Sequence, residues 1–397
     1  MWELLVNGEE IQRGFFDIDL PAQQSVIDTI PFRMPEIEVF SECVLQVSFV
    51  LKEDTKWAKA GHEVAWNQLA VPAITYYVEK PKPEGEVNAT ENQNRIEITG
   101  NNFKYILDRK TGEFSSIKFN GVEYLAGGPV FNIWRAPLAN DVDGWGSYTY
   151  KSSIKTPGLG RSIDNQLRTL GMRDLVSQVD EVEILQLSGS LVSVRIKAYS
   201  NASLPANLQK RYGRNSSAFE RNEIWTFLPD GTIELQQEII PQGTMPEMLP
   251  KIGLQFQLPK TFNQVEWFGR GPFETYPDRR TGAKIGVYKS SADKMFVPYI
   301  MPQDYGNRTD VGWLKVENES GNGLLIKGGE KLNFSLHKYS TDNLSRAMHI
   351  YELQDVPTTI LNIDYEVSGV GGTAIRQLQK YRVCPGIRNY KLTIKPY

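Results

Sequence analysis

The chain has 397 residues, enough to bury the cores of two or three domains of ordinary size. Its formal net charge of -3 comes from interspersed charges of both signs, which excludes a continuous basic surface for nucleic acid or an anionic membrane. No apolar run reaches the roughly 20 residues that span a bilayer, and the first residues lack the basic and apolar regions of a targeting segment. We therefore expect a soluble protein, cytoplasmic or periplasmic, with no nucleic-acid or membrane partner.

Strand patterns dominate the sequence from one end to the other. Between Cys43 and Leu51, the residues Leu45, Val47 and Phe49 share one face with Leu51 by the period-2 alternation of a strand. Further strands are expected where apolar and β-branched residues are bounded by Gly, Pro, Asn or Asp. They are Leu191 to Tyr199, Ile252 to Leu258, Leu332 to His337, Ile360 to Asp364 and Tyr390 to Ile394.

Two short turns predict hairpins, because their residues tolerate the positive φ of tight connections. Asn120-Gly121 separates two apolar segments, and Pro229-Asp230-Gly231 does the same further along the chain. The expected strand pairs are Ile117 to Phe119 with Val122 to Tyr124, and Ile224 to Leu228 with Thr232 to Leu235.

Helical patterning is confined to two short stretches. Asp164 to Leu170 is followed by Gly171, and Asp342 to Met348 is preceded by Ser340 and Thr341, which are residue types that cap helices. Neither stretch is long enough for an α/β protein, so an all-β fold is favoured.

The prolines and charges of residues 79–86 mark a linker, since they remove backbone donors and any apolar reason to pack. We place an immunoglobulin-like β-sandwich at residues 1–80, a linker at 81–94 and a large β domain at 95–397.

The densest group of polar and aromatic residues runs from Trp267 to Arg280 and includes Glu274, Tyr276, Asp278 and Arg279. Carbohydrate sites combine such residues, because a pyranose packs its C–H face on aromatic rings and its hydroxyls need planar polar partners. The competing interpretation is a buried loop whose arginines and carboxylates satisfy one another.

Two other clusters lie in non-periodic stretches of the kind that form loops. One contains Trp134, Arg135, Asn140 and Asp141, and the other contains Gln303, Asn307 and Arg308. Each alone is equally well explained by ordinary turn formation.

A glycosidase needs two carboxyl groups a few ångströms apart. Glu274 and Asp278 are the best local pair, and a structural role is favoured for both. Cys43 and Cys384 are too far apart in the sequence for a disulfide framework or a zinc spacing, and His62, His337 and His349 have no metal-ligand partner at helical or hairpin spacing. We expect no catalytic residue, no metal and no cofactor in this chain.

The order of these clusters resembles the C-terminal region of the glycoside hydrolase family 2 β-galactosidases. The segment from Trp57 to Gln68 is similar to the family's W-A-x-x-G-H-x-x-A-W-x-Q, and Trp134 to Asp141 is similar to W-R-A-P-x-x-N-D. The long motif from Trp267 to Arg279 resembles W-x-G-x-G-P-x-E-x-Y-x-D-R. Three shorter matches follow in order, namely P-Q-x-x-G-N-R at 302–308, L-N-I-D at 361–364 and G-x-G-G at 369–372.

The resemblance implies that the large domain is a supersandwich of the galactose-mutarotase type and that a preceding barrel carries the catalytic glutamates. No barrel motif occurs here, so the chain alone is predicted to be inactive. Its implied partners are a catalytic barrel in the same polypeptide or a companion subunit, carbohydrate, and further copies in a homo-oligomer. Eleven residues are then candidates for carbohydrate binding: Trp134, Arg135, Asn140, Asp141, Glu274, Tyr276, Asp278, Arg279, Gln303, Asn307 and Arg308.

One departure from the family bears on the substrate. Well-known members place a tryptophan, a platform for the sugar, soon after G-x-G-G, whereas Thr373 to Gln377 follows here. Galactose specificity is therefore open. Two alternatives also remain open: a stand-alone carbohydrate-binding or aldose-epimerase-like domain, and a purely structural pair of sandwiches.

Overall fold

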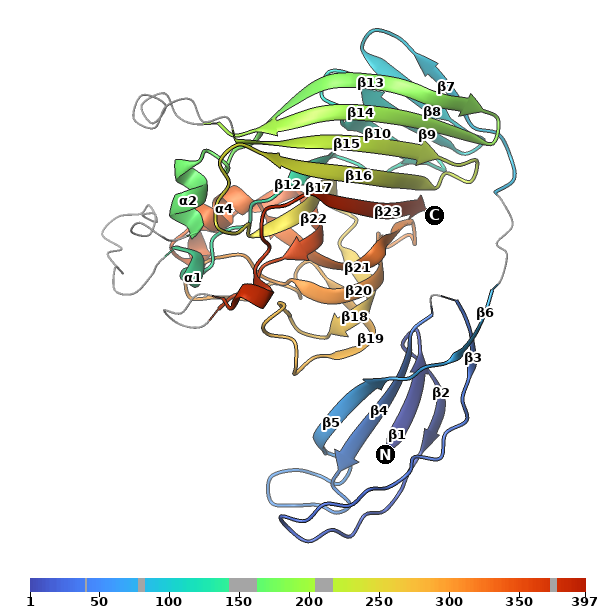
Figure 1. Ribbon diagram of the computed structural model, residues 1–397, viewed down its shortest axis with the longest axis vertical. Helices are drawn as coiled ribbons and strands as arrows, with labels where there is room; N and C mark the ends of the chain where they lie inside the picture. The colour runs from blue at the N-terminus through green and yellow to red at the C-terminus, as the bar shows by residue number, and fades with distance from the viewer. Residues whose placement is uncertain (40, 78–82, 143–162, 204–216, 372–376) are drawn as a thin grey trace. The chain divides into compact units, whose positions relative to one another are not determined.

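The computed structural model describes residues 1–39, 41–77, 83–142, 163–203, 217–371 and 377–397 (Figure 1). Its described residues divide into two compact units. The first comprises residues 1–82 with 284–287, and the second comprises residues 83–283 with 288–397. Within the described ranges, no helix has the length and apolar content needed to cross a membrane.

The first unit contains two sheets. In the described part, four strands are ordered β2-β1-β4-β5, and β3 pairs in parallel with β6. A turn with positive φ at Asn7 and Gly8 joins β1 to β2. The bounds are β1 Trp2–Val6, β2 Glu9–Gly14, β3 Glu36–Glu38, β4 Cys43–Val50, β5 Glu63–Ala70 and β6 Ile74–Tyr76.

Apolar residues from both sheets form one small core in this unit. Trp2 and Leu4 of β1 and Leu45 of β4 are buried with Ile37 of β3. The two sheets therefore form a sandwich. Phe49, expected on the same face as Leu45, is half exposed at the end of the regular pairing of β4 with β5, where the register shifts between Phe49 and Val50.

The second unit begins with a five-stranded antiparallel sheet of order β11-β10-β9-β8-β7 in the described residues. Asn120 and Gly121 both have positive φ and join β10 to β11, which confirms the first predicted hairpin. The bounds are β7 Asn88–Glu91, β8 Arg95–Thr99, β9 Phe103–Asp108, β10 Phe114–Phe119 and β11 Val122–Glu123.

Strand β7 corrects the predicted linker. Residues 81–82 lie outside the described residues, but Asn88–Glu91 pairs with β8 in antiparallel register, so the linker was extended too far toward residue 94. β7 lies at the edge of its sheet, and its side chains are mostly exposed and polar. Backbone hydrogen bonds to β8 hold it there, so it shows no apolar pattern in the sequence.

The remaining strands form a curved sheet that has twelve strands in the described part of the chain. Its path is β12-β17-β22-β21-β23-β16-β15-β14-β13; β20 pairs with β21 and β18, and β18 also pairs with β19. The bounds are β12 Gly127–Asn132, β13 Val176–Ser188, β14 Leu191–Asn201, β15 Ala218–Phe227, β16 Ile233–Gln242, β17 Lys251–Pro259, β18 Gln264–Gly271, β19 Lys284–Ser291, β20 Arg308–Glu317, β21 Gly323–Tyr339, β22 Asp355–Val367 and β23 Arg388–Pro396.

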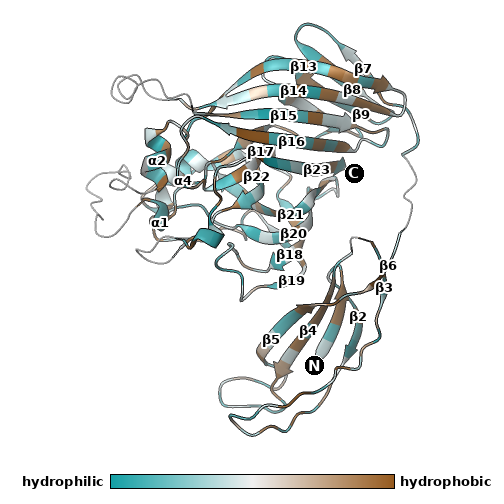
Figure 2. Cartoon of the chain, viewed as in Figure 1, coloured by the Kyte–Doolittle hydropathy of each residue, from teal (hydrophilic) through white to brown (hydrophobic). Residues whose placement is uncertain are grey.

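The strand predictions for this sheet are confirmed. The five ranges predicted from apolar and β-branched stretches between turn residues lie in β14, β17, β21, β22 and β23, and the turn at Gly231 joins β15 to β16 with positive φ. The long strands β13 to β16 run side by side, and hydrophobic and hydrophilic residues alternate along them (Figures 1 and 2).

The two sheets of this unit pack face to face over one large core. Phe114 of β10 makes an edge contact with Trp225 of β15, and Tyr105 of β9 donates a hydrogen bond to the Gly231 carbonyl. Full burial of one such aromatic or aliphatic side chain contributes about 1.5–3 kcal/mol. The prediction of an all-β fold built from sandwiches is confirmed.

Helices are few and short in the described residues: α1 Ala139–Val142, α2 Ile163–Thr169, α4 Thr341–Arg346, η1 Ile350–Glu352 and η2 Gln379–Tyr381. Both predicted helices exist, as α2 and α4. The Oγ of Ser340 accepts a hydrogen bond from the Asn343 amide at 3.0 Å, which is the expected N-cap of α4.

Candidate functional site

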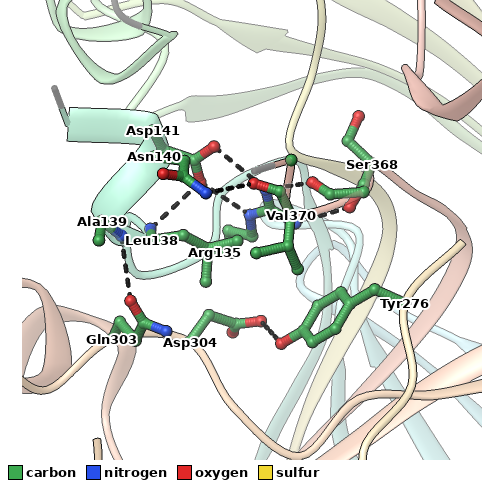
Figure 3. A network of polar contacts seen from close by, with 12 residues as sticks. Arg135, Leu138, Ala139, Asn140, Asp141, Tyr276, Gln303, Asp304, Ser368 and Val370 are labelled. Atoms are coloured by element: carbon green, nitrogen blue, oxygen red, sulfur yellow. Dashed lines mark hydrogen bonds and ion pairs between the residues drawn. The ribbon is translucent and has the colours of Figure 1, made fainter. Parts of the chain in front are cut away.

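Four loops of the second unit meet at the ends of its central strands. The strands β12 and β22 both pair with β17, and their last residues, Asn132 and Val367, lie opposite Gly253 and Lys251 at the start of β17. The segments that follow them, 133–142 and 368–371, therefore leave the sheet at the same edge. They meet the segment 272–283 that follows β18 and the segment 301–307 that precedes β20. We call these hydrogen-bonded segments the loop network (Figure 3).

Arg135 lies at the centre of the loop network. Its Nε and Nη2 donate to the two carboxylate oxygens of Asp141 at 3.0 and 3.1 Å, and Nη1 and Nη2 donate to the carbonyls of Ser368 and Gly369 at 2.8 and 3.1 Å. Arg135 and Asp141 are both fully buried. A bidentate pair of this kind fixes the orientation of both groups, so it joins the 133–142 loop to the 368–371 loop.

Asp278 holds the same segment from the opposite side. Its carboxylate accepts hydrogen bonds from the amides of Val370 and Gly371 at 2.9 and 2.7 Å. A Cβ on Gly369 would lie 2.5 Å from the carboxyl carbon of Asp278, so a glycine is required there. This close approach explains the first glycine of the G-x-G-G motif; Gly372 lies outside the described residues.

Two further contacts tie the 301–307 segment to the first loop, and a third ties it to the 272–283 segment. Gln303 accepts a hydrogen bond from the Ala139 amide at 3.0 Å (Figure 3), and the Asp304 amide donates to the Ala136 carbonyl at 3.1 Å. Tyr276 of the 272–283 segment donates to the Asp304 carboxylate at 3.1 Å (Figure 3). Asn140, beside these groups, donates to the Val370 carbonyl at 3.0 Å.

The remaining motif residues hold the 272–283 loop. Glu274 accepts hydrogen bonds from the Tyr299 hydroxyl and from the Gly306 amide, and Asn307 donates to the Thr275 carbonyl at 2.8 Å. Buried Arg308 donates to the carbonyls of Gly306 and Pro272, both at 2.9 Å.

Burial and charge set the protonation of this cluster. Burial alone would lower the pKa of Arg135, but the adjacent Asp141 raises it above its ordinary value, so the guanidinium stays charged. Burial, reinforced by the charge of Asp304, raises the pKa of Tyr276 and keeps its hydroxyl a donor. Burial lowers the pKa of Arg308 to about 10. All three groups hold fixed protonation states near neutral pH.

The structure thus places all eleven predicted residues in or directly beside the four loops, and most of their polar groups bind other parts of the chain. Trp134 is buried, with the guanidinium carbon of Arg168 5.6 Å from its ring centroid. Arg279 is exposed and makes no side-chain hydrogen bond to the described residues. Nothing in these contacts tests carbohydrate binding, which stays a prediction.

Sequence reasoning missed three members of the loop network. Asp304 lies inside a recognised motif but was not selected as a candidate. Ser368 joins the network because its backbone carbonyl accepts a hydrogen bond from Arg135, and Gln377 joins because its side-chain amide donates to the Gly369 carbonyl. The only sequence signal for these three residues is their position within or next to the 302–308 and 369–372 motifs.

Glu274 and Asp278, the best local carboxylate pair, are both engaged by backbone amides, which suits the structural role that we favoured for them. No group of three or more metal-ligating side chains occurs in the described ranges. His337 is buried, stacks on Tyr305 with ring centroids 4.2 Å apart, and bonds the Tyr305 carbonyl through Nε2. The segment that replaces the platform tryptophan, 373–376, lies outside the described residues.

The fold and the loop network define a class of β-sandwich protein in which the loops at the strand ends are joined by hydrogen bonds and a buried ion pair. A family model described as "Beta galactosidase small chain" matches residues 99–395, and one described as "Beta-galactosidase, domain 4" matches residues 1–72. The chain belongs to the β-galactosidase small-chain family.

Individual relatives agree with this placement. A β-galactosidase of Priestia megaterium is 30% identical over 374 residues, which cover 94% of this chain and 33% of the relative. One of Vibrio cholerae is 28% identical over 380 residues, covering 93% of this chain and 33% of the relative. The chain therefore spans about a third of the length of these relatives. Among solved structures, a GalM/aldose epimerase homologue from C. elegans is similar with a TM-score of 0.38 and 8% identity, over 79% of this chain and 99% of that one.

Proposed function

We propose that this chain is the C-terminal part of a larger glycoside hydrolase that cleaves terminal β-galactosides. A catalytic barrel, in the same polypeptide or in a companion subunit, would supply the general acid and the nucleophile. Relatives named β-galactosidases extend well beyond the region that this chain matches, which supports the proposal. In this arrangement the chain contributes no cofactor and no catalytic carboxylate, and the whole enzyme is a homo-oligomer.

The observation that carries the role we propose for this chain within such an enzyme is the double anchoring of residues 368–371. Arg135 binds the carbonyls of Ser368 and Gly369, while Asp278 binds the amides of Val370 and Gly371. Backbone groups that are fixed from both sides hold their positions when a partner surface or substrate arrives, which lowers the entropic cost of ordering a site. The role that we assign to the loop network is to hold a rigid rim beside the active site of the whole enzyme.

Direct contact with carbohydrate is a second element of the proposal. Arg279 makes no side-chain hydrogen bond to the described residues, and Asn140 and Gln303 each use only one half of their side-chain amide in the contacts above. These three side chains have planar polar groups left over for hydroxyls. The other members of the loop network would have to break internal hydrogen bonds to bind a sugar.

The test is complementation. The chain is mixed with the separately expressed remainder of its polypeptide, and hydrolysis of a chromogenic β-galactoside is followed. We expect each part alone to be inactive and the mixture to be active. Failure of a matched, folded barrel fragment to gain activity from this chain would contradict the proposal.

A variant pair separates a rim role from mere assembly. Asp278→Asn keeps the size of the side chain but loses one of the two acceptors for the 370–371 amides, and we expect kcat/KM of the mixture to fall about tenfold, equivalent to about 1.4 kcal/mol. Asp293→Asn, at an exposed carboxylate of the same unit, is the control and should leave kcat/KM unchanged.

A further inference from the structure

The first unit carries an apolar hollow of about 630 Å³, and none of the eleven candidate residues lines it. Its wall comprises the end of β4, the first residue of the chain and the segment 15–26, which follows β2. The volume is within the range of about 300–1,000 Å³ that is usual for binding sites. Eight of the thirteen lining residues are apolar: Met1, Phe15, Phe16, Ile18, Leu20, Val26, Phe49 and Val50.

Several of these apolar side chains are left out of the core of the first unit. Phe16 packs against that core, but Phe15 beside it is 71% exposed. Val26 and Phe49 are 56% and 51% exposed. Single exposed apolar side chains are ordinary in proteins, whereas a group of them that lines one hollow is typical of an interaction surface.

The polar groups of the hollow do not favour a sugar or an ion. Only two of its side chains are charged, and they pair with each other, since Lys52 Nζ lies 3.1 Å from the Asp17 carboxylate. The Ser48 hydroxyl donates to the Glu63 carboxylate at 2.6 Å. The hollow therefore has no net side-chain charge and few groups for ligand hydroxyls. Apolar residues accompanied by a minority of polar ones are the composition of a protein–protein interface.

Met1 fixes the place at which a preceding part of the polypeptide is joined. Its nitrogen donates to the Ser48 carbonyl at 3.0 Å, and its carbonyl accepts from the Ser48 amide at 2.9 Å. Such a reciprocal pair extends the antiparallel ladder of β1 and β4 and persists when the nitrogen belongs to a peptide bond. The chain spans about a third of the length of its relatives. In the proposed enzyme, the preceding domain is thus attached at the wall of the hollow.

We propose that this hollow docks the catalytic domain that precedes the chain in the whole enzyme, by receiving apolar side chains of that domain. The inference rests on the proposed function, which supplies the domain, and it names the surface that holds it. Attachment at Met1 keeps the domain at a high effective concentration beside the hollow, so a modest buried area is sufficient. A second copy of this chain has no such attachment.

Hydroxyl-radical footprinting of the whole enzyme and of this chain alone tests the proposal, with rates normalised to an added reference peptide. We expect Phe15 and Phe49 to be oxidised about fivefold more slowly in the whole enzyme, because the centre of an interface is fully buried. Equal rates in the two samples would overturn the proposal. Protection that develops in this chain alone as its concentration rises would identify a second copy as the occupant and would also overturn it.

A double variant places the docked domain in the hollow. Phe15→Asp combined with Val26→Asp introduces charges into the apolar centre, so Phe49 should lose most of its protection in the whole enzyme. The melting temperature of this chain alone should stay unchanged, because both side chains are exposed. The matched control combines Tyr351→Asp with Ile387→Asp, at exposed residues of the second unit, and should keep Phe49 protected. Full protection of Phe49 in the hollow variant would show that something else covers it and that the proposal is wrong.

Hydrolysis of a chromogenic β-galactoside by the same whole enzyme reports separately on the proposed function. Protection without hydrolysis would contradict the proposed activity and support the docking surface. Hydrolysis without protection would overturn the docking surface alone.

Discussion

Replacing Arg135 with methionine removes the central cation of the loop network while keeping much of the side-chain volume. Asp141 would then be a buried carboxylate without its ionic partner, and breaking a buried pair in this way costs about 3–5 kcal/mol. The Ser368 carbonyl also loses its hydrogen bond, which adds about 1 kcal/mol, whereas the Gly369 carbonyl keeps the bond from Gln377. We expect Arg135→Met to lower the free energy of unfolding by about 4–6 kcal/mol.

Urea denaturation followed by far-UV circular dichroism measures this change, and hydrogen exchange locates it. Exchange should accelerate most in residues 133–142 and 368–371, which lose their common anchor. Arg346→Met is the matched control, because its ion pair with Asp342 is largely exposed and contributes at most about 1 kcal/mol.

A double variant tests the physical cause. Arg135→Met combined with Asp141→Leu removes both charges, so several kcal/mol of the loss should be regained. The reasoning is refuted if Arg135→Met costs no more than Arg346→Met, or if the double variant is as unstable as the single one.

Three further predictions follow from buried contacts elsewhere in the second unit. Burial raises the pKa of Asp364 to about 6 despite its pairing with Lys251, so protonation of this carboxyl stabilises the fold fully below pH 4 and this stabilisation is lost as the pH rises through 6. Relative to Asp364→Asn in urea denaturation, the free energy of unfolding of the parent should fall by about 2–3 kcal/mol between pH 4 and 7. If the free energies of unfolding of the two proteins changed in parallel with pH, this prediction would be wrong. A Cβ on Gly253 would lie 2.3 Å from the Ile363 carbonyl oxygen, so Gly253→Ala should cost about 1–3 kcal/mol in thermal unfolding. Gly189→Ala should be neutral, because the added Cβ would make only an ordinary contact, 3.9 Å from the Glu86 side chain; similar melting temperatures of the two variants would disprove the clash. Tyr276→Phe leaves the buried Asp304 carboxylate without the tyrosine donor and should cost about 1–3 kcal/mol in the same assay, against no loss for Tyr351→Phe.

Local features of the sequence were sufficient wherever a structure depends on neighbouring residues. Asn120 and Gly121 adopt the positive φ that their side chains permit, and Ser340 caps α4 with its own hydroxyl. Apolar and β-branched stretches bounded by turn residues predicted the strands of the large sheet for the same reason, because both signals lie within the segment itself. β7 was missed because an edge strand needs backbone pairing and no apolar pattern.

The sequence by itself also determined which residue types gather in the loops, since Arg135, Asp141, Glu274 and Asp278 stand in recognisable motifs. Only the tertiary structure decided what they bind. Arg135 meets Ser368 across 233 residues and Asp278 meets Val370 across 92, and such pairings depend on which strand ends the sheet brings to one edge. The same holds for the Tyr365 hydroxyl, which has no partner among the described residues, because a buried hydroxyl is left unpaired only when packing excludes both water and every neighbouring acceptor.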